Sequence, residues 1–323
     1  QKVAVLTQYN SRSLNEHLAS SKWWNFGRKQ GGLFLFTPSF ADADSNWYRG
    51  TADSIAQNIS FLKTSHEPYV VIASGDCIYK MDYNKVLSWH VEKRADITVV
   101  VKQMPDDFNV ERYGVVRMDE DDRIQDFVEK PVVAQYSTIS CGIYVIRRRL
   151  LIELLERCID ENRYDFVQDI LIRYRGLKKI YGYRMEEYWS NIASVDDYYR
   201  TNMDFLKPEI RDYFFRQYPD VHSRAADLPP AKYNVGVKIR NSLLSSGCIV
   251  NGTVENSILF QQVYVGNNCV IRNSLILNDV YIGDNTIIEN CIVESGDTIQ
   301  ANSCYRGENG IKIVIEKGER YTI

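Results

Sequence analysis

Short apolar runs alternate with helix-like segments over about the first 205 residues. Continuous β-branched runs predict strands, and apolar residues at helical spacing predict helices, the first of them with a serine cap. The strands are expected at residues 3–9, 69–76 and 95–104, and the helices at residues 11–20, 51–64 and 84–94. This alternation predicts an α/β domain with a mostly parallel sheet covered on both faces. Such sheets bind ligands at the edge where their strands end.

The pattern changes at about residue 236, where helical periodicity is lost and short apolar pairs recur among Gly, Asn and Ser. A triplet of Asn, Ser or Cys, and Leu or Ile begins at Asn241, Asn256, Asn273 and Asn290, with spacings of 15, 17 and 17 residues. A short period of β-branched residues and turn formers predicts a stacked β-solenoid. The repeat resembles the hexapeptide repeat of left-handed parallel β-helices, and its uneven spacing indicates that some turns are shortened.

These two patterns predict two domains. We expect an α/β domain at residues 1–207, a linker rich in charge and chain breaks at residues 208–235, and the solenoid at residues 236–323. Many acyltransferases are built on the same repeat and use a histidine on a coil. None of the four histidines of this chain lies in the repeats, which favours a structural solenoid over a catalytic one.

Composition narrows the function classes further. The net charge of −3 gives no electrostatic reason to expect nucleic acid or a membrane as partner. No apolar run approaches the roughly 18 residues that a membrane span needs, and no secretory signal opens the chain. The seven cysteines are scattered without a C-x-x-C pair, which is typical of buried, reduced thiols in a cytoplasmic protein.

Three short motifs contain side chains suited to phosphate and sugar chemistry. Asp76 follows a predicted strand directly, where a carboxylate holds Mg²⁺ or merely caps the next helix. Glu129 and Lys130 precede a proline, where they bind a sugar hydroxyl and a phosphate or form an ordinary exposed charged pair. Residues 46–55 place Gly and Thr51 at a helix start, which either binds an anion or is capped by Thr51.

Taken together and in order, the motifs closely resemble the glucose-1-phosphate adenylyltransferase (ADP-glucose pyrophosphorylase) family of bacterial glycogen synthesis. They are WYRGTADSIAQN (47–58), SGDCIYKMDY (74–83), YGV (113–115), FVEKP (127–131), SCGIYV (140–145), YDFVQDIL (164–171) and LPPAKY (228–233). The resemblance runs along the whole chain and implies a Rossmann-like nucleotidyltransferase domain, then a left-handed parallel β-helix, in a tetramer that makes ADP-glucose and pyrophosphate from ATP and glucose 1-phosphate.

The same resemblance implies roles for individual residues. Asp76 would be a Mg²⁺ ligand. The glucose 1-phosphate site would consist of Tyr48, Gly114, Glu129, Lys130 and Ser140. Activators would bind through the region TQYNSRSL, where Gln8 and Arg12 would take part, unless Arg12 is a solvated side chain on a surface helix.

Three departures from the family pattern bear on catalysis. The N-terminal strand and Gly-rich loop that hold ATP are missing: either the sequence lacks its true N-terminus, which the absence of an initiator Met favours, or the loop is absent. Asn191 stands where the family has the second Mg²⁺-binding Asp, and Ala193 and Ser194 replace its Gly and Thr. A neutral amide weakens a site for a hard cation. Val167 replaces a Gly near the sugar site.

The departures resemble the regulatory D-type subunit that some Gram-positive bacteria make beside the catalytic one. We therefore expect a catalytically impaired chain with weakened Mg²⁺ binding, partnered by a catalytic subunit in a hetero-tetramer and still able to bind glucose 1-phosphate or ADP-glucose. Two alternatives stay open. One is an active adenylyltransferase that tolerates Asn191, and the other is a sugar-phosphate-binding scaffold protein.

Overall fold

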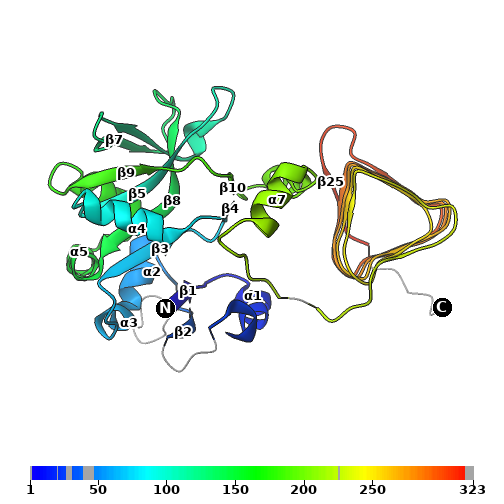
Figure 1. Ribbon diagram of the computed structural model, residues 1–323, viewed down its shortest axis with the longest axis horizontal. Helices are drawn as coiled ribbons and strands as arrows, with labels where there is room; N and C mark the ends of the chain where they lie inside the picture. Colours follow the sequence, from blue (N-terminus) through cyan, green and yellow to red (C-terminus); the bar gives the residue numbers. More distant parts are fainter. Residues whose placement is uncertain (1, 20, 27–30, 39–46, 225, 317–323) are drawn as a thin grey trace. The chain divides into compact units, whose positions relative to one another are not determined.

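The chain forms two compact units. The computed structural model describes residues 2–19, 21–26, 31–38, 47–224 and 226–316 (Figure 1). The first unit comprises Gln1–Gly75, Lys80–Trp189 and His222–Arg224, and the second comprises Asp76–Tyr79, Ser190–Val221 and Ala225–Ile323. Among the described residues no helix is long and apolar enough to cross a membrane.

A six-stranded sheet forms the centre of the first unit, with the order β7-β6-β8-β5-β9 and with β3 also paired to β8. The sheet is mixed, whereas the sequence predicted a mostly parallel one. The long strand β8 runs antiparallel to β3, β5 and β6, and only β5 and β9 are parallel within this sheet. Its strands are β3 (Tyr69–Ala73), β5 (Ile97–Gln103), β6 (Gly114–Met118), β7 (Ile124–Glu129), β8 (Thr138–Arg147) and β9 (Ile180–Arg184). A separate parallel pair joins β1 (Lys2–Leu6) to β2 (Gly32–Phe36).

Helices cover both faces of the six-stranded sheet, as the sequence predicted. Ile97, Val99 and Val101 of β5 are fully buried in a core shared with α2 and α5, while Thr98 on the opposite face bonds to His90 of α4. The helices of this unit are α1 (Ser11–Leu18), α2 (Thr51–Gln57), α3 (Ile59–Lys63), α4 (Tyr83–Glu92) and α5 (Arg148–Asp160). Three short turns of other helix types are η1 (Ser21–Trp24), η2 (Val110–Arg112) and η3 (Val167–Ile172), the last a π-helix.

Two local expectations about helices were wrong. The predicted helix at residues 51–64 is broken at Asn58, whose backbone has φ −107° and whose amide donates to the Ser54 carbonyl and the Tyr48 hydroxyl. The first helix begins at Ser11 after Asn10, which is left-handed and makes no capping side-chain hydrogen bond. In both places an Asn side chain or backbone changes the chain direction, which helical periodicity does not reveal.

The solenoid of the second unit has three parallel five-stranded sheets, which form the three sides of a triangle in cross-section (Figure 1). Equivalent strands of successive coils are 15 or 17 residues apart, as the Asn spacing predicted, except at the end of the third sheet, where Cys291 pairs with Lys312, 21 residues later. The first sheet contains β11 (Lys232–Tyr233), β14 (Ile249–Val250), β17 (Tyr264–Val265), β20 (Tyr281–Ile282) and β23 (Thr298–Ile299). The second contains β12 (Lys238–Arg240), β15 (Thr253–Glu255), β18 (Val270–Arg272), β21 (Ile287–Glu289) and β24 (Cys304–Arg306), and the third β13 (Leu243–Leu244), β16 (Ile258–Leu259), β19 (Leu275–Ile276), β22 (Cys291–Val293) and β25 (Lys312–Val314).

The recurring asparagines turn the corners of these coils. Asn241, Asn256, Asn273 and Asn290 all have positive φ between 43° and 54°, a conformation that Asn tolerates better than most residues. Their amides also bond along the stack, with Asn256 Nδ2 2.7 Å from Asn273 Oδ1 and Asn273 Nδ2 3.2 Å from Asn290 Oδ1. The sequence signal for the solenoid therefore has a direct conformational cause.

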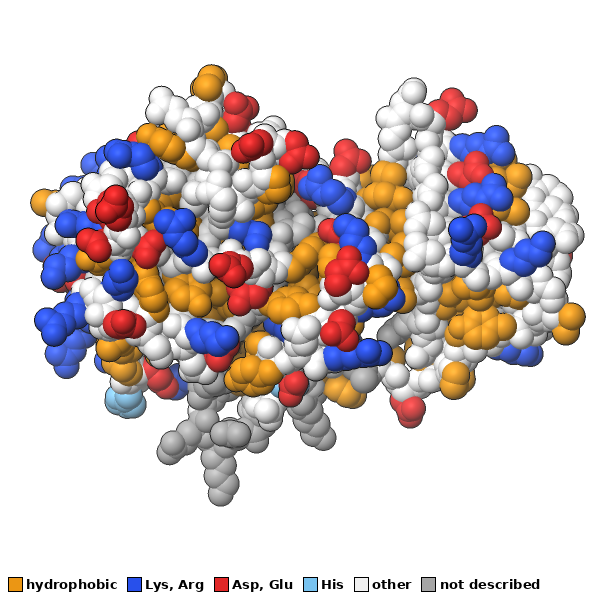
Figure 2. All heavy atoms as spheres, turned by 45° about the horizontal axis from the view of Figure 1, so that its top comes forward, with side chains coloured by type: hydrophobic (Ala, Val, Ile, Leu, Met, Phe, Trp, Pro, Cys, Tyr) orange, Lys and Arg blue, Asp and Glu red, His pale blue; other side chains and the backbone are white. Residues whose placement is uncertain are grey.

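Charged side chains also alternate along one side of the solenoid. Arg272 of β18 bonds to Glu255 on the preceding coil at 2.9 Å and to Glu289 on the following coil at 3.2 Å, and Arg306 continues the series at 3.0 Å. Figure 2 shows basic and acidic side chains interleaved on this unit. These ladders reinforce the hydrogen-bonded stacking of the coils.

A helical segment precedes the solenoid within the second unit. The helix α6 (Val195–Asp204) packs through Tyr199 and Met203 against Ile258 and Leu275, and the Tyr199 hydroxyl donates to the Asn273 carbonyl at 2.7 Å. The next helix, α7 (Pro208–Arg216), occupies the start of the region predicted to be a linker. The short strands β4 (Cys77–Tyr79) and β10 (Trp189–Asn191) pair with each other.

Candidate functional site

Asp76 and Asn191 lie side by side, as expected if they occupy the two metal-ligand positions of the family pattern. The strands β4 and β10 bring them together, since the Ile192 N–H donates to the Asp76 carbonyl at 2.8 Å. The Asn191 amide is oriented as a donor, with Nδ2 3.3 Å from the Asp76 carbonyl oxygen and 3.6 Å from Cys77 Sγ. The Asp76 carboxylate is exposed and accepts a contact from Cys77 Sγ at 3.4 Å.

This donor set is a poor match for Mg²⁺. It has one carboxylate, and the neighbouring amide presents its NH₂ group to the Asp76 carbonyl. Mg²⁺ prefers anionic oxygen ligands in near-octahedral geometry. No cluster of three or more His, Cys, Asp or Glu side chains suited to a metal occurs among the described residues. With one carboxylate and a neutral amide, the residues present offer Mg²⁺ less negative charge than the two carboxylates that the family pattern implies.

Gly114 and Glu129 form the last residue pair at the open end of the β6–β7 hairpin. They lie opposite each other in the sheet, and a Cβ atom on Gly114 would be 2.6 Å from a Phe127 ring carbon and 2.9 Å from Glu129 Oε2. The absence of a side chain at Gly114 thus leaves room for the Glu129 carboxylate. Lys130 follows with positive φ, its backbone N–H donating to the Tyr113 carbonyl at 3.1 Å and its exposed ammonium 4.0 Å from Glu129 Oε1.

A half-buried group of acidic and hydroxyl side chains surrounds Glu129. Burial raises the pKa of Glu129, with Lys130 opposing that effect and the nearby Asp165 carboxylate adding to it. Ser140 is buried on β8, 3.5 Å from the Tyr144 hydroxyl. Burial also raises the pKa of Tyr144. The group therefore offers both acceptors and neutral O–H donors, which is the chemistry that binds sugar hydroxyls.

Tyr48 is held by contacts with two other segments. Its backbone N–H donates to Gln8 Oε1 at 2.5 Å, and its hydroxyl accepts from Asn58 Nδ2 at 3.1 Å. Burial raises the pKa of the Tyr48 phenol. The predicted regulatory residue Gln8 is thus bonded directly to the predicted substrate residue Tyr48. Arg12 is far more exposed and, among the residues that the structure describes, pairs with Glu16, one turn along α1, at 3.0 Å.

The helix start at residues 50–53 serves a structural purpose. The N–H groups of Ala52 and Asp53 both donate to the Tyr164 carbonyl, at 2.8 and 3.2 Å. Gly50 permits this approach, because a Cβ atom there would be 2.4 Å from the same oxygen. Thr51 Oγ1 accepts from the Phe166 N–H at 2.9 Å. These donors are occupied by the protein itself, so the anion-binding interpretation of this helix start was wrong, and Thr51 does not cap its own helix.

The segment DFVQD (165–169) stabilises the turn next to Tyr164, whose carbonyl accepts the helix N–H groups. Asp169 Oδ2 accepts the backbone N–H groups of Tyr164 and Asp165, at 3.0 and 2.9 Å, and so holds the turn before η3. Val167 packs partly buried against the main core of the first unit. Its side chain thus contributes to that core.

Sequence reasoning missed two members of the group near Ser140. The Asp165 carboxylate adds to the raised pKa of Glu129, and both carboxylates add to the raised pKa of Tyr144. Tyr144 and Asp165 are about 20 residues apart in sequence. Tyr144 lies four residues after Ser140 on the same strand, a spacing that places two side chains on one face of a strand. That spacing was the available signal. For Asp165 the signal was its place in the motif YDFVQDIL, two residues before Val167, which the resemblance sets near the sugar site.

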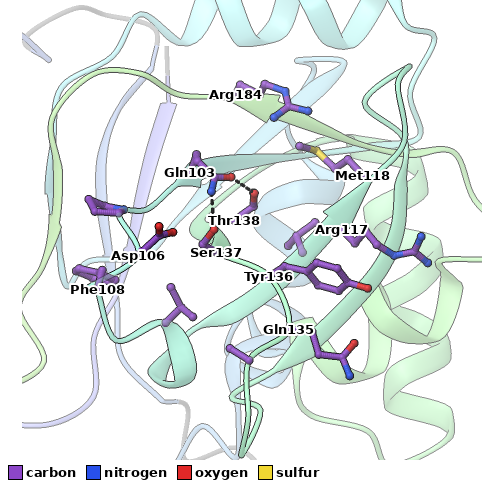
Figure 3. Close-up of a pocket in the computed structure, with 14 residues that line it drawn as sticks. Gln103, Asp106, Phe108, Arg117, Met118, Gln135, Tyr136, Ser137, Thr138 and Arg184 are labelled. Carbon is purple, nitrogen blue, oxygen red and sulfur yellow. Dashed lines mark hydrogen bonds between the residues drawn. The ribbon is translucent and has the colours of Figure 1, made fainter.

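The first unit also contains a cavity of about 540 Å³ at another part of the sheet (Figure 3). Its lining, taken over the described residues, includes none of the five residues predicted to bind glucose 1-phosphate. It lies next to strands that carry two of them, β6 with Gly114 and β8 with Ser140.

Comparison with known proteins agrees with the fold and the motifs. A family model described as nucleotidyl transferase matches residues 1–208, and one described as a GlmU-like C-terminal hexapeptide matches residues 229–308. The glucose-1-phosphate adenylyltransferase of Thermosipho melanesiensis is 36% identical over 276 residues, covering 84% of this chain and 66% of that protein. The proteins of the same name from Clostridium novyi and Clostridium acetobutylicum are 34% and 36% identical, over 83% of this chain and 71% of each of theirs. The chain thus spans about two thirds of the length of these relatives, and it belongs to the glucose-1-phosphate adenylyltransferase family.

Proposed function

We propose that this chain is a regulatory, catalytically impaired subunit of a glucose-1-phosphate adenylyltransferase, acting in glycogen synthesis beside a catalytic subunit in a hetero-oligomer. The observation that carries the proposal is the Asp76–Asn191 pair. Asn191 gives its amide hydrogen to the Asp76 carbonyl at 3.3 Å, at the position where the family pattern requires an anionic metal ligand. Enzymes that transfer phosphoryl groups act mainly by neutralising the charge that develops on the phosphate in the transition state. The loss of an anionic metal ligand is therefore expected to slow the chemical step.

The sugar-phosphate half of the site supports retained binding. Gly114 leaves space for Glu129, Lys130 presents an exposed ammonium beside it, and Ser140 and Tyr144 supply hydroxyl groups nearby. The chain therefore binds glucose 1-phosphate without turning it over efficiently. A subunit of this kind acts on its partner through contacts between subunits, with Gln8 joined to Tyr48 as a route from the regulatory region to the substrate region.

The test is ADP-glucose formation from ATP and glucose 1-phosphate with Mg²⁺, using the complete gene product purified alone and then with a catalytic subunit of the family. We expect little turnover by the folded chain alone, and a change in activity or activation when the catalytic subunit is added and co-purifies. Turnover comparable to an ordinary family member would contradict the proposal and favour an active enzyme. Failure to co-purify, with glucose 1-phosphate still bound, would favour a sugar-phosphate-binding scaffold.

A matched pair of variants separates the metal defect from the sugar site. Asn191→Asp alone should leave activity far below that of a catalytic subunit, because the other departures remain. Lys130→Gln should weaken glucose 1-phosphate binding in calorimetry by about tenfold, the loss of one charge-assisted contact. Recovery of full activity by Asn191→Asp would refute the proposed impairment, and unchanged binding in Lys130→Gln would refute the proposed sugar-phosphate contact.

A further inference from the structure

The break between α2 and α3 places the side chain of Asn58 where a backbone N–H lies in an unbroken helix. In such a helix the Ser54 carbonyl would accept the N–H of the fourth residue after it. Here the Asn58 N–H donates instead to the Ile55 carbonyl, at 3.1 Å. The Asn58 amide takes its place, with Nδ2 2.9 Å from the Ser54 carbonyl oxygen. The break therefore holds this amide in a fixed direction.

This arrangement settles the direction of the hydrogen bond between Asn58 and Tyr48. A carbonyl oxygen only accepts, so the group that faces Ser54 is the NH₂ of the Asn58 amide. The same NH₂ also donates to the Tyr48 hydroxyl oxygen, 3.1 Å away. Since Tyr48 accepts in this bond, its own O–H hydrogen is left for another acceptor, and none receives it among the residues that the structure describes. Burial raises the pKa of the Tyr48 phenol, although the bond from Asn58 opposes that effect, so the phenol keeps this hydrogen at neutral pH.

The backbone on both sides of Tyr48 is held by other side chains. Asp53 is 4% exposed and accepts the backbone N–H of Arg49 at 2.8 Å and its guanidinium at 3.0 Å. Gln57 Nε2 lies 2.9 Å from Asp53 Oδ2 and 3.4 Å from the Trp47 carbonyl oxygen. The amide bonded to the Tyr48 hydroxyl is therefore left to control the direction of the phenol hydrogen.

The segment that carries Tyr48 is joined to the group around Glu129. The Asp53 N–H donates to the Tyr164 carbonyl at 3.2 Å. The next residue, Asp165, lies close enough to Glu129 to add to the rise in its pKa. Tyr48 is itself partly exposed, so a ligand can reach its hydroxyl. The fold thus fixes the start of α2 relative to the residues proposed to bind the sugar.

We infer that Asn58 is a positioning residue for glucose 1-phosphate: it holds the Tyr48 hydroxyl oxygen as an acceptor and so directs the phenol hydrogen to an oxygen of the bound sugar phosphate. The inference rests on the proposed binding of glucose 1-phosphate through Tyr48 and adds the group that orients this contact. An amide is needed at position 58, because a side chain that only accepts would take the phenol hydrogen for itself. The break in the helix then serves the site, since an unbroken helix would give the Ser54 carbonyl to the backbone.

The test is a set of variants of the full chain, measured by calorimetry with glucose 1-phosphate. Tyr48→Phe removes the phenol hydrogen and should weaken binding about tenfold. Asn58→Ala leaves the hydroxyl free to turn and should weaken binding about threefold. Asn58→Asp keeps the size of the side chain but can only accept, so the phenol hydrogen turns to it and binding should weaken about tenfold.

The same two substitutions at position 58 are then made in the Tyr48→Phe background. Neither should weaken binding further by more than about twofold, because the group through which they act is gone. Asn202→Ala is the matched control, since the Asn202 amide also donates to a carbonyl four residues earlier, that of Tyr198 at 2.8 Å, and lies on α6. This control should bind glucose 1-phosphate like the wild type.

The outcomes separate the inference from the proposed function. Losses that add in the double variants, while the wild type binds glucose 1-phosphate, would overturn the inference alone, because position 58 would then act through folding or charge. Tighter binding by Asn58→Asp than by Asn58→Ala would also overturn it, since that order is expected when only the size of the side chain matters. Wild-type affinity in Tyr48→Phe would show that the phenol hydrogen is not used. Absence of binding to the folded wild-type chain would overturn the proposed retention of glucose 1-phosphate binding, and the inference with it.

Discussion

The buried histidine of α4 makes the stability of the first unit depend on pH. His90 is 1% exposed, its Nδ1 lies 2.7 Å from Thr98 Oγ1, and its Nε2 is buried with no partner in the described structure. Burial, helped by Arg147 and opposed by Asp96, lowers the pKa of His90 from 6.5 to about 4. Protonation would place a second charged N–H where nothing accepts it.

The magnitude follows from this lowering. One pKa unit corresponds to about 1.4 kcal/mol, so the drop from 6.5 to about 4 amounts to about 3 kcal/mol. Above pH 6.5 both the folded and the unfolded states hold His90 neutral. Between about pH 6.5 and 4 the unfolded chain binds a proton that the folded chain excludes, so the free energy of unfolding falls as the pH falls through this window. Below about pH 4 both states are charged, and this group causes no further loss.

The comparison of wild type with His90→Gln isolates this effect, because Gln can still bond to Thr98 but does not titrate. All five tryptophans lie in the first unit, so urea unfolding followed by Trp fluorescence reports on that unit. Between pH 7 and 4.5 the wild type should lose about 2 kcal/mol more than His90→Gln. His66→Gln, at an exposed histidine, should follow the wild type. Equal losses in wild type and His90→Gln would refute the reasoning.

Three further substitutions test the packing of the motifs. Gly50→Ala places a Cβ atom 2.4 Å from the Tyr164 carbonyl oxygen and should destabilise the first unit by roughly 2 kcal/mol in urea unfolding, whereas Gly75→Ala meets no atom within 4 Å and should have little effect. Gly114→Ala places a Cβ atom 2.9 Å from the carboxylate paired with it in the sheet and should weaken glucose 1-phosphate binding about tenfold in calorimetry; unchanged affinity would remove Gly114 from the site. Asn273→Ala, at φ 46°, should destabilise the solenoid by about 2 kcal/mol in far-UV circular dichroism melts and Asn273→Gly by less, and equal losses would show that backbone strain is not the cause.

The solenoid could be predicted because its signal is local. Each recurring Asn is needed at its own position, to hold a left-handed corner and to bond to the next Asn along the stack. Features of this kind repeat in the sequence whenever they repeat in the fold. The β6–β7 hairpin was not predicted: the resemblance grouped Gly114 with Glu129, and the structure places them opposite each other in the sheet.

The mixed sheet and the contacts that hold the start of α2 could not be predicted, because both depend on partners far apart in sequence. The strand β8 takes β3 and β6 on one edge and β5 on the other, and alternating strands and helices do not indicate that order. The need for glycine at position 50 is explained by the close approach of the Tyr164 carbonyl, more than 100 residues away in sequence. Sequence alone left that glycine equally compatible with a phosphate site, which the structure excludes by occupying the helix donors.

The geometry at Asn191 changes what the missing carboxylate means. In the sequence, Asn191 stands in place of a metal-binding Asp and is a weaker ligand. In the structure its amide is also a donor to the Asp76 carbonyl and lies close to Cys77 Sγ, so the Asn191 side chain has partners within the protein. A carboxylate at 191 would place an anionic oxygen against that carbonyl oxygen, an arrangement that only a bound cation or an altered rotamer would relieve. Under the proposed function, this contact between the amide and the carbonyl takes the place of a metal ligand, as expected of a subunit that leaves turnover to its partner.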